Sequence, residues 1–249
     1  MELIKGSESF SCETQSKIGI LAIQGFSGAT GSIVYLAKFF AKQGFNVECP
    51  RLTGHGTNWQ DLEKTLHTDW INDVEKALDI LKKRVETVFV VGLSMGGALA
   101  LYLTSKYPDI KGIILINNAL ILKHPKFFFV PFLKNFVRTT TGIGSDIKDP
   151  NEKEICYEAI PIKGVYQFLK TLEVGRKNIS KVNQPIIIFK SKEDHVIPCY
   201  NATYTYKKVS SKEKELIWLT NSYHVATMDY DKDLICQKSL DFVNKYDKI

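Results

Sequence analysis

The chain has 249 residues, of which 44% are hydrophobic and 24% are charged, as is ordinary for a globular protein. This length suits one large α/β domain and can bury a core that needs no disulfide or metal staples. The formal net charge of +6 comes without a dense basic run interleaved with aromatic residues, so a nucleic acid is not an expected partner.

The cysteines and the apolar runs indicate the cellular compartment of the protein and whether it inserts into a membrane. The five cysteines are scattered and form no C-x-x-C pair, which argues against a zinc site and a disulfide framework. The amino terminus lacks the apolar core of a signal peptide, and no apolar run approaches the roughly 18 residues of a membrane span. We therefore expect a cytoplasmic protein with no metal or other cofactor and no stable membrane insertion, either monomeric or homodimeric.

Short apolar runs alternate with longer segments of helical periodicity along most of the chain. Continuous apolarity over so few residues is typical of strands that are covered on both faces in a parallel sheet. Strands are predicted at Ile18–Ile23, Asn46–Pro50, Thr87–Gly92, Gly112–Asn117, Pro185–Lys190 and Glu215–Leu219. Helices are predicted at Ile33–Lys42, Asp69–Lys83, Met95–Lys106 and Lys232–Lys245. This repetition predicts an α/β fold with a mostly parallel central sheet and helices on both faces.

One segment, from Asn118 to Val182, breaks this alternation. It runs through KHPKFFFVPFLKNF and several helix-like turns without a clear strand, and no linker-like composition borders it. We interpret residues 118–182 as a small cap insertion over one end of the sheet. Residues 1–117 and 183–249 then form the core.

Ser94 stands in the stretch GLSMG, residues 92–96, at the join of a predicted strand and a predicted helix. This matches G-x-S-x-G, a sharp strand-to-helix turn that exposes a nucleophilic serine at the edge of a sheet. Glycine is needed at the flanking positions because a Cβ there would clash where backbone segments approach closely. The alternative is a small-residue turn needed only for packing the helix on the strand.

A serine hydroxyl needs a base, and in such folds an acid and a histidine follow the serine in that order. His224 follows the last predicted strand, at the same edge of the sheet as Ser94, and is the predicted base. In SKEDHVIP the better acid candidate is Asp194, which leaves Glu193 solvated. Asp229 is a more distant candidate, which we expect to support the loop after the histidine.

Acyl transfer also needs donors for the oxyanion of the tetrahedral intermediate. One is the backbone N–H that follows the nucleophile, here Met95. The second is expected from the glycine-rich loop QGFSGATG after the first predicted strand, where Phe26 is the predicted donor. A plain turn is the alternative for this loop.

With these residues in place, the chain resembles the α/β-hydrolase superfamily, and within it the bacterial carboxylesterases and monoacylglycerol lipases. The similarity runs through QGFSGATGSIVYLAKFFAKQGFNVECPRLTGHG, DWINDVEKAL, GLSMGG, SKEDHVIP and NSYHVATMD. It implies an α/β-hydrolase fold, a triad of Ser94, Asp194 and His224, and oxyanion donors at Phe26 and Met95. The departure is Gln24, which stands where the family usually has a histidine before the glycine of the oxyanion loop. Since an amide can donate and accept similarly, we expect the loop geometry to survive.

The substrate pocket is the least determined part of the prediction. Its candidate residues are Gln24 and the aromatic cluster of the insertion, Phe127, Phe128, Phe129 and Phe132, with Phe136 beside them. The cluster could line an acyl pocket, join the cap to the sheet, or contact lipid aggregates. His55, in TGHG, is expected to buttress a loop near the site.

These residues predict a serine hydrolase that cleaves carboxylic esters of short to medium acyl chains, a small-molecule substrate class that includes monoacylglycerols. The same triad also serves thioesterases, C–C bond hydrolases and perhydrolytic variants. A rival from another class is a non-catalytic ligand-binding protein on the same fold.

Overall fold

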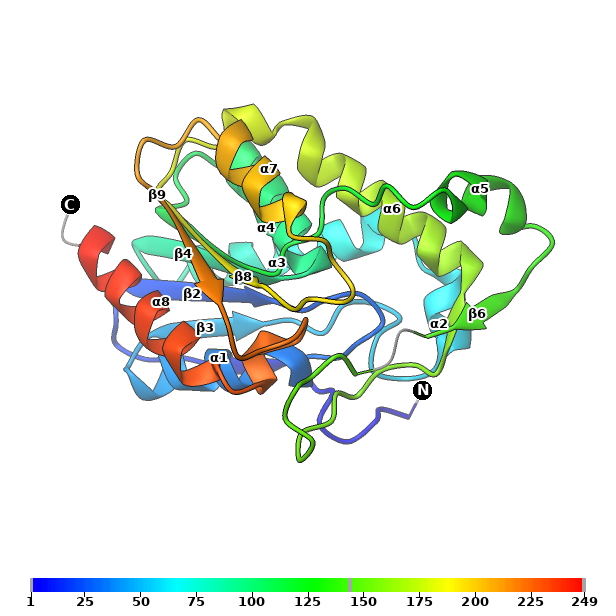
Figure 1. Ribbon diagram of the computed structural model, residues 1–249. Coiled ribbons are helices and arrows are strands. Elements are labelled where there is room, and N and C mark those ends of the chain that lie inside the picture. The colour runs from blue at the N-terminus through cyan, green and yellow to red at the C-terminus, as the bar shows by residue number, and fades with distance from the viewer. Residues whose placement is uncertain (1, 143–144, 248–249) are drawn as a thin grey trace.

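Over residues 2–142 and 145–247, which the computed structural model describes, seven strands form one sheet in the order β1-β3-β2-β4-β5-β8-β9 (Figure 1). All neighbours in this sheet are parallel except β1, which pairs antiparallel with β3 at the edge. The strands are β1 (Phe10–Cys12), β2 (Ile18–Ile23), β3 (Asn46–Cys49), β4 (Thr87–Leu93), β5 (Gly112–Ile116), β8 (Ile186–Ser191) and β9 (Lys214–Leu219).

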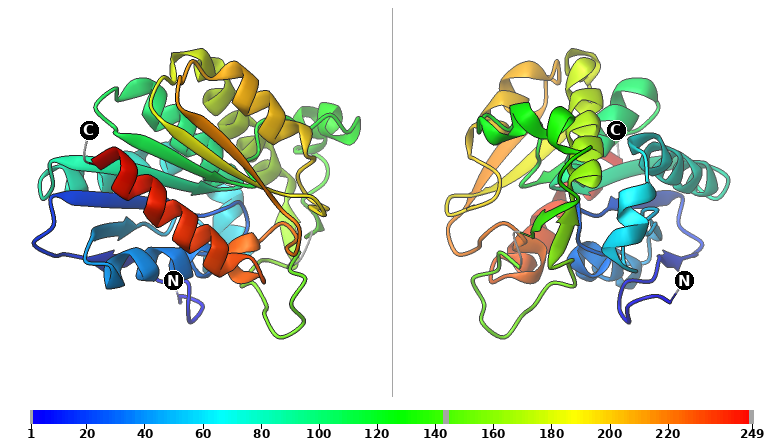
Figure 2. Two further views of the ribbon diagram at one scale, coloured as in Figure 1. Left: turned by 60° about the vertical axis from the view of Figure 1, so that its left-hand side comes forward. Right: turned by 90° about the vertical axis from the view of Figure 1, so that its right-hand side faces the viewer.

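Helices cover both faces of the sheet because side chains along each central strand alternate between two apolar cores. In β2, Leu21 and Ile23 belong to one core, while Ile20 and Ala22 belong to the other. The first core includes residues of α3 (His67–Lys82), α4 (Met95–Lys106) and α7 (Tyr200–Lys208). The second includes residues of α1 (Gly31–Lys42) and α8 (Lys232–Asp247), which lie together on the other side in Figures 1 and 2. The predicted α/β fold is confirmed.

The predicted elements of the core agree with the structure to within two residues at each end. The structure adds the short edge strand β1, the helices α2 (Trp59–Lys64) and α7, and the 3-10 turn η2 (Ala226–Met228). These were not predicted because each is short or carries a mixed polar and aromatic sequence with no clear period. Isolated helices of such length depend on packing for their stability.

Residues 118–182, interpreted above as a cap insertion and called the insertion below, contain α5 (Lys126–Leu133), β6 (Thr139–Thr141), β7 (Ala159–Pro161), α6 (Ile162–Lys177) and the turn η1 (Ile179–Lys181). Contrary to the expectation of no clear strand, β6 and β7 pair antiparallel. Three-residue strands such as these carry too little pattern to be recognised from sequence. α6 approaches α4 so closely that a Cβ on Gly175 would lie 2.5 Å from the carbonyl oxygen of Ala98. The second half of the insertion therefore packs on the core, while α5 projects away from it (Figure 1).

Candidate active site

Ser94 lies between the end of β4 and the start of α4 with φ 54° and ψ −116°, a conformation that side chains rarely adopt. Backbone hydrogen bonds hold it there. Its N–H donates to the carbonyl of Ile116 in β5, and its carbonyl accepts from Gly97 and Ala119, each at 3.0 Å. The strained serine is therefore clamped between two adjacent strands and the first turn of the helix.

Glycine is required on both sides of this turn. A Cβ on Gly92 would lie 2.3 Å from the carbonyl oxygen of Gly96, and one on Gly96 would lie 2.2 Å from that of Ile23. Since both neighbours are backbone atoms of the sheet and the helix, neither can move aside at low cost. The close backbone approach that the sequence predicts at Gly92 and Gly96 is therefore present in the structure.

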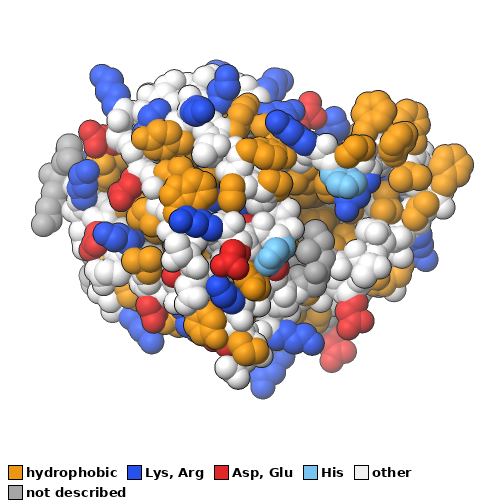
Figure 3. All heavy atoms as spheres, viewed as in Figure 1, with side chains coloured by type: hydrophobic (Ala, Val, Ile, Leu, Met, Phe, Trp, Pro, Cys, Tyr) orange, Lys and Arg blue, Asp and Glu red, His pale blue; other side chains and the backbone are white. Residues whose placement is uncertain are grey.

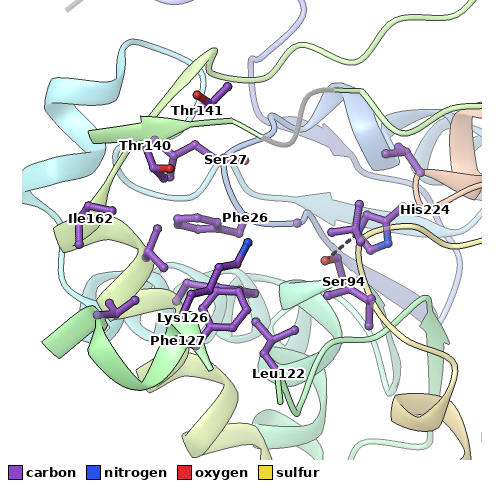
Figure 4. A pocket seen from close by; sticks show the side chains of 18 of the residues that line it. Phe26, Ser27, Ser94, Leu122, Lys126, Phe127, Thr140, Thr141, Ile162 and His224 are labelled. Carbon is purple, nitrogen blue, oxygen red and sulfur yellow. Dashed lines mark hydrogen bonds between the residues drawn. The ribbon is translucent and has the colours of Figure 1, made fainter. Parts of the chain in front are cut away.

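The structure brings the three residues of the predicted triad together. The Nε2 atom of His224 lies 3.0 Å from the Oγ atom of Ser94, the contact drawn as a dashed line in Figure 4. On the other side of the ring, Nδ1 lies 3.0 Å from Oδ2 of Asp194. Ser94 and His224 are both buried except for a small face toward the pocket. This is the geometry in which a carboxylate orients an imidazole that can take a proton from a hydroxyl.

Asp194 is held as a carboxylate by donors on every side. Its Oδ1 accepts the backbone N–H groups of Val196 at 2.9 Å and Ile197 at 2.7 Å, and its Oδ2 contacts both His224 and the ammonium of Lys190. Burial raises the pKa of Asp194, but His224 and then Lys190 outweigh it and lower that pKa to about 2. Glu193 points away and pairs with Lys148 at 3.1 Å.

Asn117, at the end of β5, joins the acid loop to the histidine loop. Its Nδ2 donates to the carbonyl of His224 at 2.8 Å and to Oγ of Ser191 at 2.9 Å, while its Oδ1 accepts from the N–H of Ser191 at 2.8 Å. Asn117 has φ 45°, which asparagine tolerates better than most residues. Sequence reasoning missed this residue, whose signal was a polar side chain directly after a buried strand.

The insertion also contributes to the histidine loop through Asp146. Its Oδ2 accepts the backbone N–H groups of His195 at 3.2 Å and His224 at 3.1 Å, and its Oδ1 lies 2.9 Å from Nδ1 of His195. Nothing in the local sequence pointed to this role, because Asp146 lies almost 80 residues before His224.

Asp229 supports the same loop. It is fully buried, and its carboxylate accepts backbone N–H groups from both the histidine loop and the insertion. The donors are Tyr223 and Tyr230 at 2.9 and 2.8 Å, and Lys148 and Asp149 at 2.8 and 3.1 Å. This agrees with the supporting role expected for Asp229 and places it away from the imidazole.

The loop after β2 lies against the serine. A Cβ built on Gly25 would be 3.4 Å from Cβ of Ser94, so the backbone that carries Phe26 passes beside the nucleophile. Met95 is the first residue of α4, where backbone N–H groups have no acceptor within the helix. Both residues predicted to supply the oxyanion donors therefore lie close to Ser94 along the chain or in the fold.

The ring of Phe26 packs inside a small aromatic cluster. It stacks on Phe168 of α6 with centroids 4.8 Å apart and meets Trp70 and His55 at 5.9 and 6.1 Å. His55 is buried beneath it, and burial lowers the pKa of His55 to about 4, so its ring is neutral near neutral pH. His55 buttresses the loop, as expected.

A cavity of about 290 Å³ opens from Ser94 toward the insertion (Figure 4). Core and insertion both line it, mostly with apolar side chains. These include Phe26, Leu122, Phe127, Val130, Leu133, Ile160, Ile162, Val165, Phe168, Val196 and Ile197. An apolar cavity with few polar groups is typical of a small-molecule site.

The structure corrects most of the predicted pocket lining. Phe127 lies at the cavity, but Phe128, Phe129 and Phe132 point to solvent with 74, 53 and 66% of their surface exposed. They are neighbours in sequence, and on one helix only the side chains of one face can reach the cavity. Gln24 does not line it either. Gln24 is fully buried, and its amide donates to the carbonyl of Gly28 and accepts from the N–H of Leu52.

Glu154 is a polar member of the cavity wall that sequence reasoning missed. Its carboxyl lies over the loop after β2, where a Cβ on Gly28 would come within 2.4 Å of its Oε1. Burial raises the pKa of Glu154 to about 7, against the opposing attraction of His224. The cavity therefore offers, close to the triad, a carboxyl that is partly protonated at neutral pH.

Metal and membrane features can be stated for the part of the chain that the structure describes. Within it, no group of three or more His, Cys, Asp or Glu side chains is arranged to hold a metal ion. In the same ranges, 2–142 and 145–247, the helices are all too short or too polar to cross a membrane.

Comparison with known proteins assigns the family. The family model described as serine aminopeptidase, S33, matches residues 14–231. A thermostable monoacylglycerol lipase of Bacillus sp. (strain H-257) is 40% identical over 98% of this chain and 97% of its own length. A carboxylesterase of Bacillus subtilis (strain 168) is 25% identical over 92% of this chain and 93% of its own.

Solved structures share the fold of this chain. One from a study of the metagenome-derived lipolytic enzymes LipS and LipT has a TM-score of 0.95 and 38% identity, and the match covers 98% of this chain and all of the other. A monoacylglycerol lipase of Paleococcus ferrophilus, at 16% identity with 99% of this chain and all of the other covered, shares the fold with a TM-score of 0.80. The chain therefore belongs to the S33 family of α/β hydrolases.

Proposed function

We propose that this chain is a serine hydrolase that cleaves carboxylic esters of short to medium acyl chains, with monoacylglycerols as the leading candidates. The observation that carries the proposal is the line of contacts from Ser94 through His224 to Asp194 at the floor of an apolar cavity. The lipase and esterase relatives support the same reaction class.

In this mechanism, Oγ of Ser94 attacks the ester carbonyl while Nε2 of His224 takes the hydroxyl proton. Asp194 stabilises the resulting imidazolium, and the backbone N–H groups of Phe26 and Met95 bind the oxyanion. The imidazolium then gives its proton to the leaving alkoxide, so that an alcohol departs and an acyl-enzyme remains. Water, deprotonated by His224, attacks the acyl carbon, and the carboxylic acid leaves as Ser94 regains its proton.

The cavity suggests how the two halves of the substrate are placed. The apolar side chains from α5, β7 and α6 suit the acyl chain. Glu154 lies near His224 and can donate or accept hydrogen bonds at neutral pH, which suits the free hydroxyl groups of a glyceryl leaving group. This placement favours monoacylglycerols over esters of simple alcohols.

The test is steady-state hydrolysis of p-nitrophenyl esters of increasing acyl length and of a monoacylglycerol. We expect turnover with an optimum length set by the cavity, and a loss of at least about a thousandfold in Ser94→Ala. Ser105→Ala, in the same helix but far from its start, is the matched control and should retain full activity. Equal background rates in wild type and Ser94→Ala would contradict the proposal, and faster cleavage of acyl-thioesters would move it to thioester hydrolysis.

The location proposed for the enzyme rests on its cysteines. The five cysteines are free, which suits a reducing cytoplasm. We propose that the enzyme works there as a monomer or a homodimer, which analytical ultracentrifugation distinguishes.

A further inference from the structure

Lys190 is a fully buried lysine near the end of β8, with no exposed side-chain surface. Lysine is almost never buried in this way unless its charge is paired. Its Nζ contacts Oδ2 of Asp194 and donates to the carbonyl of Ile197 at 2.7 Å. The ammonium thus links the side chain of Asp194 to the backbone of Ile197 within the loop that carries the acid of the triad.

The contact with Asp194 falls on the oxygen that also faces the imidazole. Oδ2 lies between Nζ of Lys190 and Nδ1 of His224, while Oδ1 is occupied by backbone N–H groups. The carboxylate therefore divides its charge between a buried ammonium and a ring that must become a cation during the reaction. A buried cation this close to an imidazolium opposes its formation, because little solvent screens the two charges.

The other ionisable groups around Lys190 do not replace its charge. Cys199 and Asp146 are the further ionisable groups near it, and Asp146 is engaged with the backbone of the two triad loops and with the ring of His195. Glu154 lines the same cavity as His224 in wild type and in Lys190 variants alike, so a difference between them does not come from Glu154. Burial lowers the pKa of Lys190, while Asp194 opposes this lowering as the contact partner. The pairing geometry itself indicates that the carboxylate and the ammonium form a neutral unit next to His224.

We propose that Lys190 is a positioning residue that holds Oδ2 of Asp194 in place and offsets part of the negative charge that this carboxylate presents to the imidazole of His224. As a result, the enzyme should keep its activity in more acidic solution than it would without this cation. The cost is a less stabilised imidazolium during catalysis. This role rests on the proposed function of the triad.

The test compares the pH dependence of kcat/KM in wild type, Lys190→Gln and Lys190→Met. Removing the cation leaves the full charge of the Asp194 carboxylate facing the imidazole, so the acidic limb of the profile should move to higher pH by about one unit in both variants. The plateau at high pH should change less, because Val196 and Ile197 still hold Oδ1 of Asp194.

Lys192→Gln is the matched control. Lys192 lies two residues further along the chain, is exposed, and carries the same charge. Because solvent screens an exposed charge, its removal should leave the acidic limb within about 0.2 unit of wild type. A shift in Lys192→Gln equal to that in Lys190→Gln would overturn the proposal, since any nearby lysine would then act alike.

Two further outcomes would overturn it. One is a lower plateau in both Lys190 variants with an unchanged acidic limb, which would mean that the lysine only packs the loop. The other is loss of the folded state in both variants, measured by circular dichroism, which would assign Lys190 to folding.

The rate at which an organophosphate labels Ser94, followed over the same pH range, separates this proposal from the proposed function. Labelling needs the nucleophile and base but no ester substrate. Absent ester turnover with normal labelling would count against the proposed substrate class alone. An acidic limb of labelling that does not move in Lys190→Gln would count against the role of Lys190.

Discussion

The edge of the sheet around Ser94 and the outer face of α5 differ in how they meet solvent. At the sheet edge, buried polar groups such as Asn117 and Asp229 are each bound by several hydrogen bonds. On α5 and just beyond it, large aromatic side chains stand in water, with Phe136 87% exposed. Figure 3 shows them as a group of hydrophobic side chains at the upper right.

This difference fits two tasks. Proton transfer needs atoms held near 3 Å, which the hydrogen bonds of Asn117, Asp194 and Asp229 provide around the triad. An exposed apolar face has no such internal partners, and in soluble proteins such a face commonly marks a site of contact with a membrane or another protein. The reaction centre is therefore built from buried, hydrogen-bonded polar groups, whereas the outer face of α5 is apolar and exposed.

The largest expected effect comes from a change at the edge of the sheet around Ser94. In Gly96→Ala, the new Cβ would meet the carbonyl oxygens of Ile23 and Gln24 at 2.2 and 2.6 Å, forcing the helix away from β2. We expect kcat/KM for a p-nitrophenyl ester to fall at least about a hundredfold, since displacements of about 1 Å can have that effect. Thermal unfolding should show a loss of about 1–3 kcal/mol, as for other overpacked sites.

Gly44→Asn is the control for this prediction. Gly44 also has a positive φ, of 90°, but a Cβ there meets no atom within 4 Å. It should lower stability slightly and leave kcat/KM unchanged. An active Gly96→Ala enzyme would show that the turn at Ser94 tolerates movement.

A smaller effect on activity is expected from changes on the exposed outer face of α5. In the double variant Phe128→Ser with Phe132→Ser, activity on a water-soluble ester should stay within about twofold, because neither ring lines the cavity. Activity on an aggregated monoacylglycerol should fall several-fold, since exposed aromatic groups near lysines favour an apolar, anionic interface. Co-sedimentation with phosphatidylcholine–phosphatidylglycerol vesicles should weaken in parallel.

Leu234→Ser, an exposed apolar position on α8, is the control for this double variant. It should leave vesicle binding and both activities unchanged. Equal losses on soluble and aggregated substrates in the double variant would show that α5 shapes the cavity instead of contacting lipid.

The smallest expected effect is on thermal stability and concerns Glu154, which lines the cavity. Because its folded-state pKa is raised to about 7, ionising it in the folded protein is unfavourable. The stability that its protonated form contributes is present below the unfolded value and is lost as pH rises through about 7. Glu154→Gln should therefore unfold at the same temperature as wild type near pH 4 and about 2–4 °C above it at pH 8.

Glu158→Gln, an exposed position in the same segment, serves as the comparison and should show no such pH-dependent gain. A Glu154→Gln protein that is less stable than wild type at pH 8 would mean that the ionised carboxylate has a partner and is stabilised.

Much of the site could be predicted because it depends on local chemistry and on chain order. Ser94 stands at a strand-to-helix join with glycines that only a tight turn requires, and His224 follows the last strand. In a parallel sheet, the carboxyl ends of neighbouring strands meet at one edge, so these residues were expected to lie together. The parts that failed involve side chains whose direction depends on the tertiary structure, above all Phe128, Phe129 and Phe132.

By itself, the sequence determined the fold class and the residues to be tested as a triad, because apolar periodicity and turn chemistry are local properties, and the resemblance of its motifs to those of the α/β hydrolases indicated the family. Only the tertiary structure decided what surrounds them. It placed Asp146 from the insertion on the backbone of His224, buried Lys190 against Asp194, and turned most of the aromatic cluster to solvent. Contacts between residues distant in the chain depend on how the elements pack, and no short stretch of sequence encodes that packing.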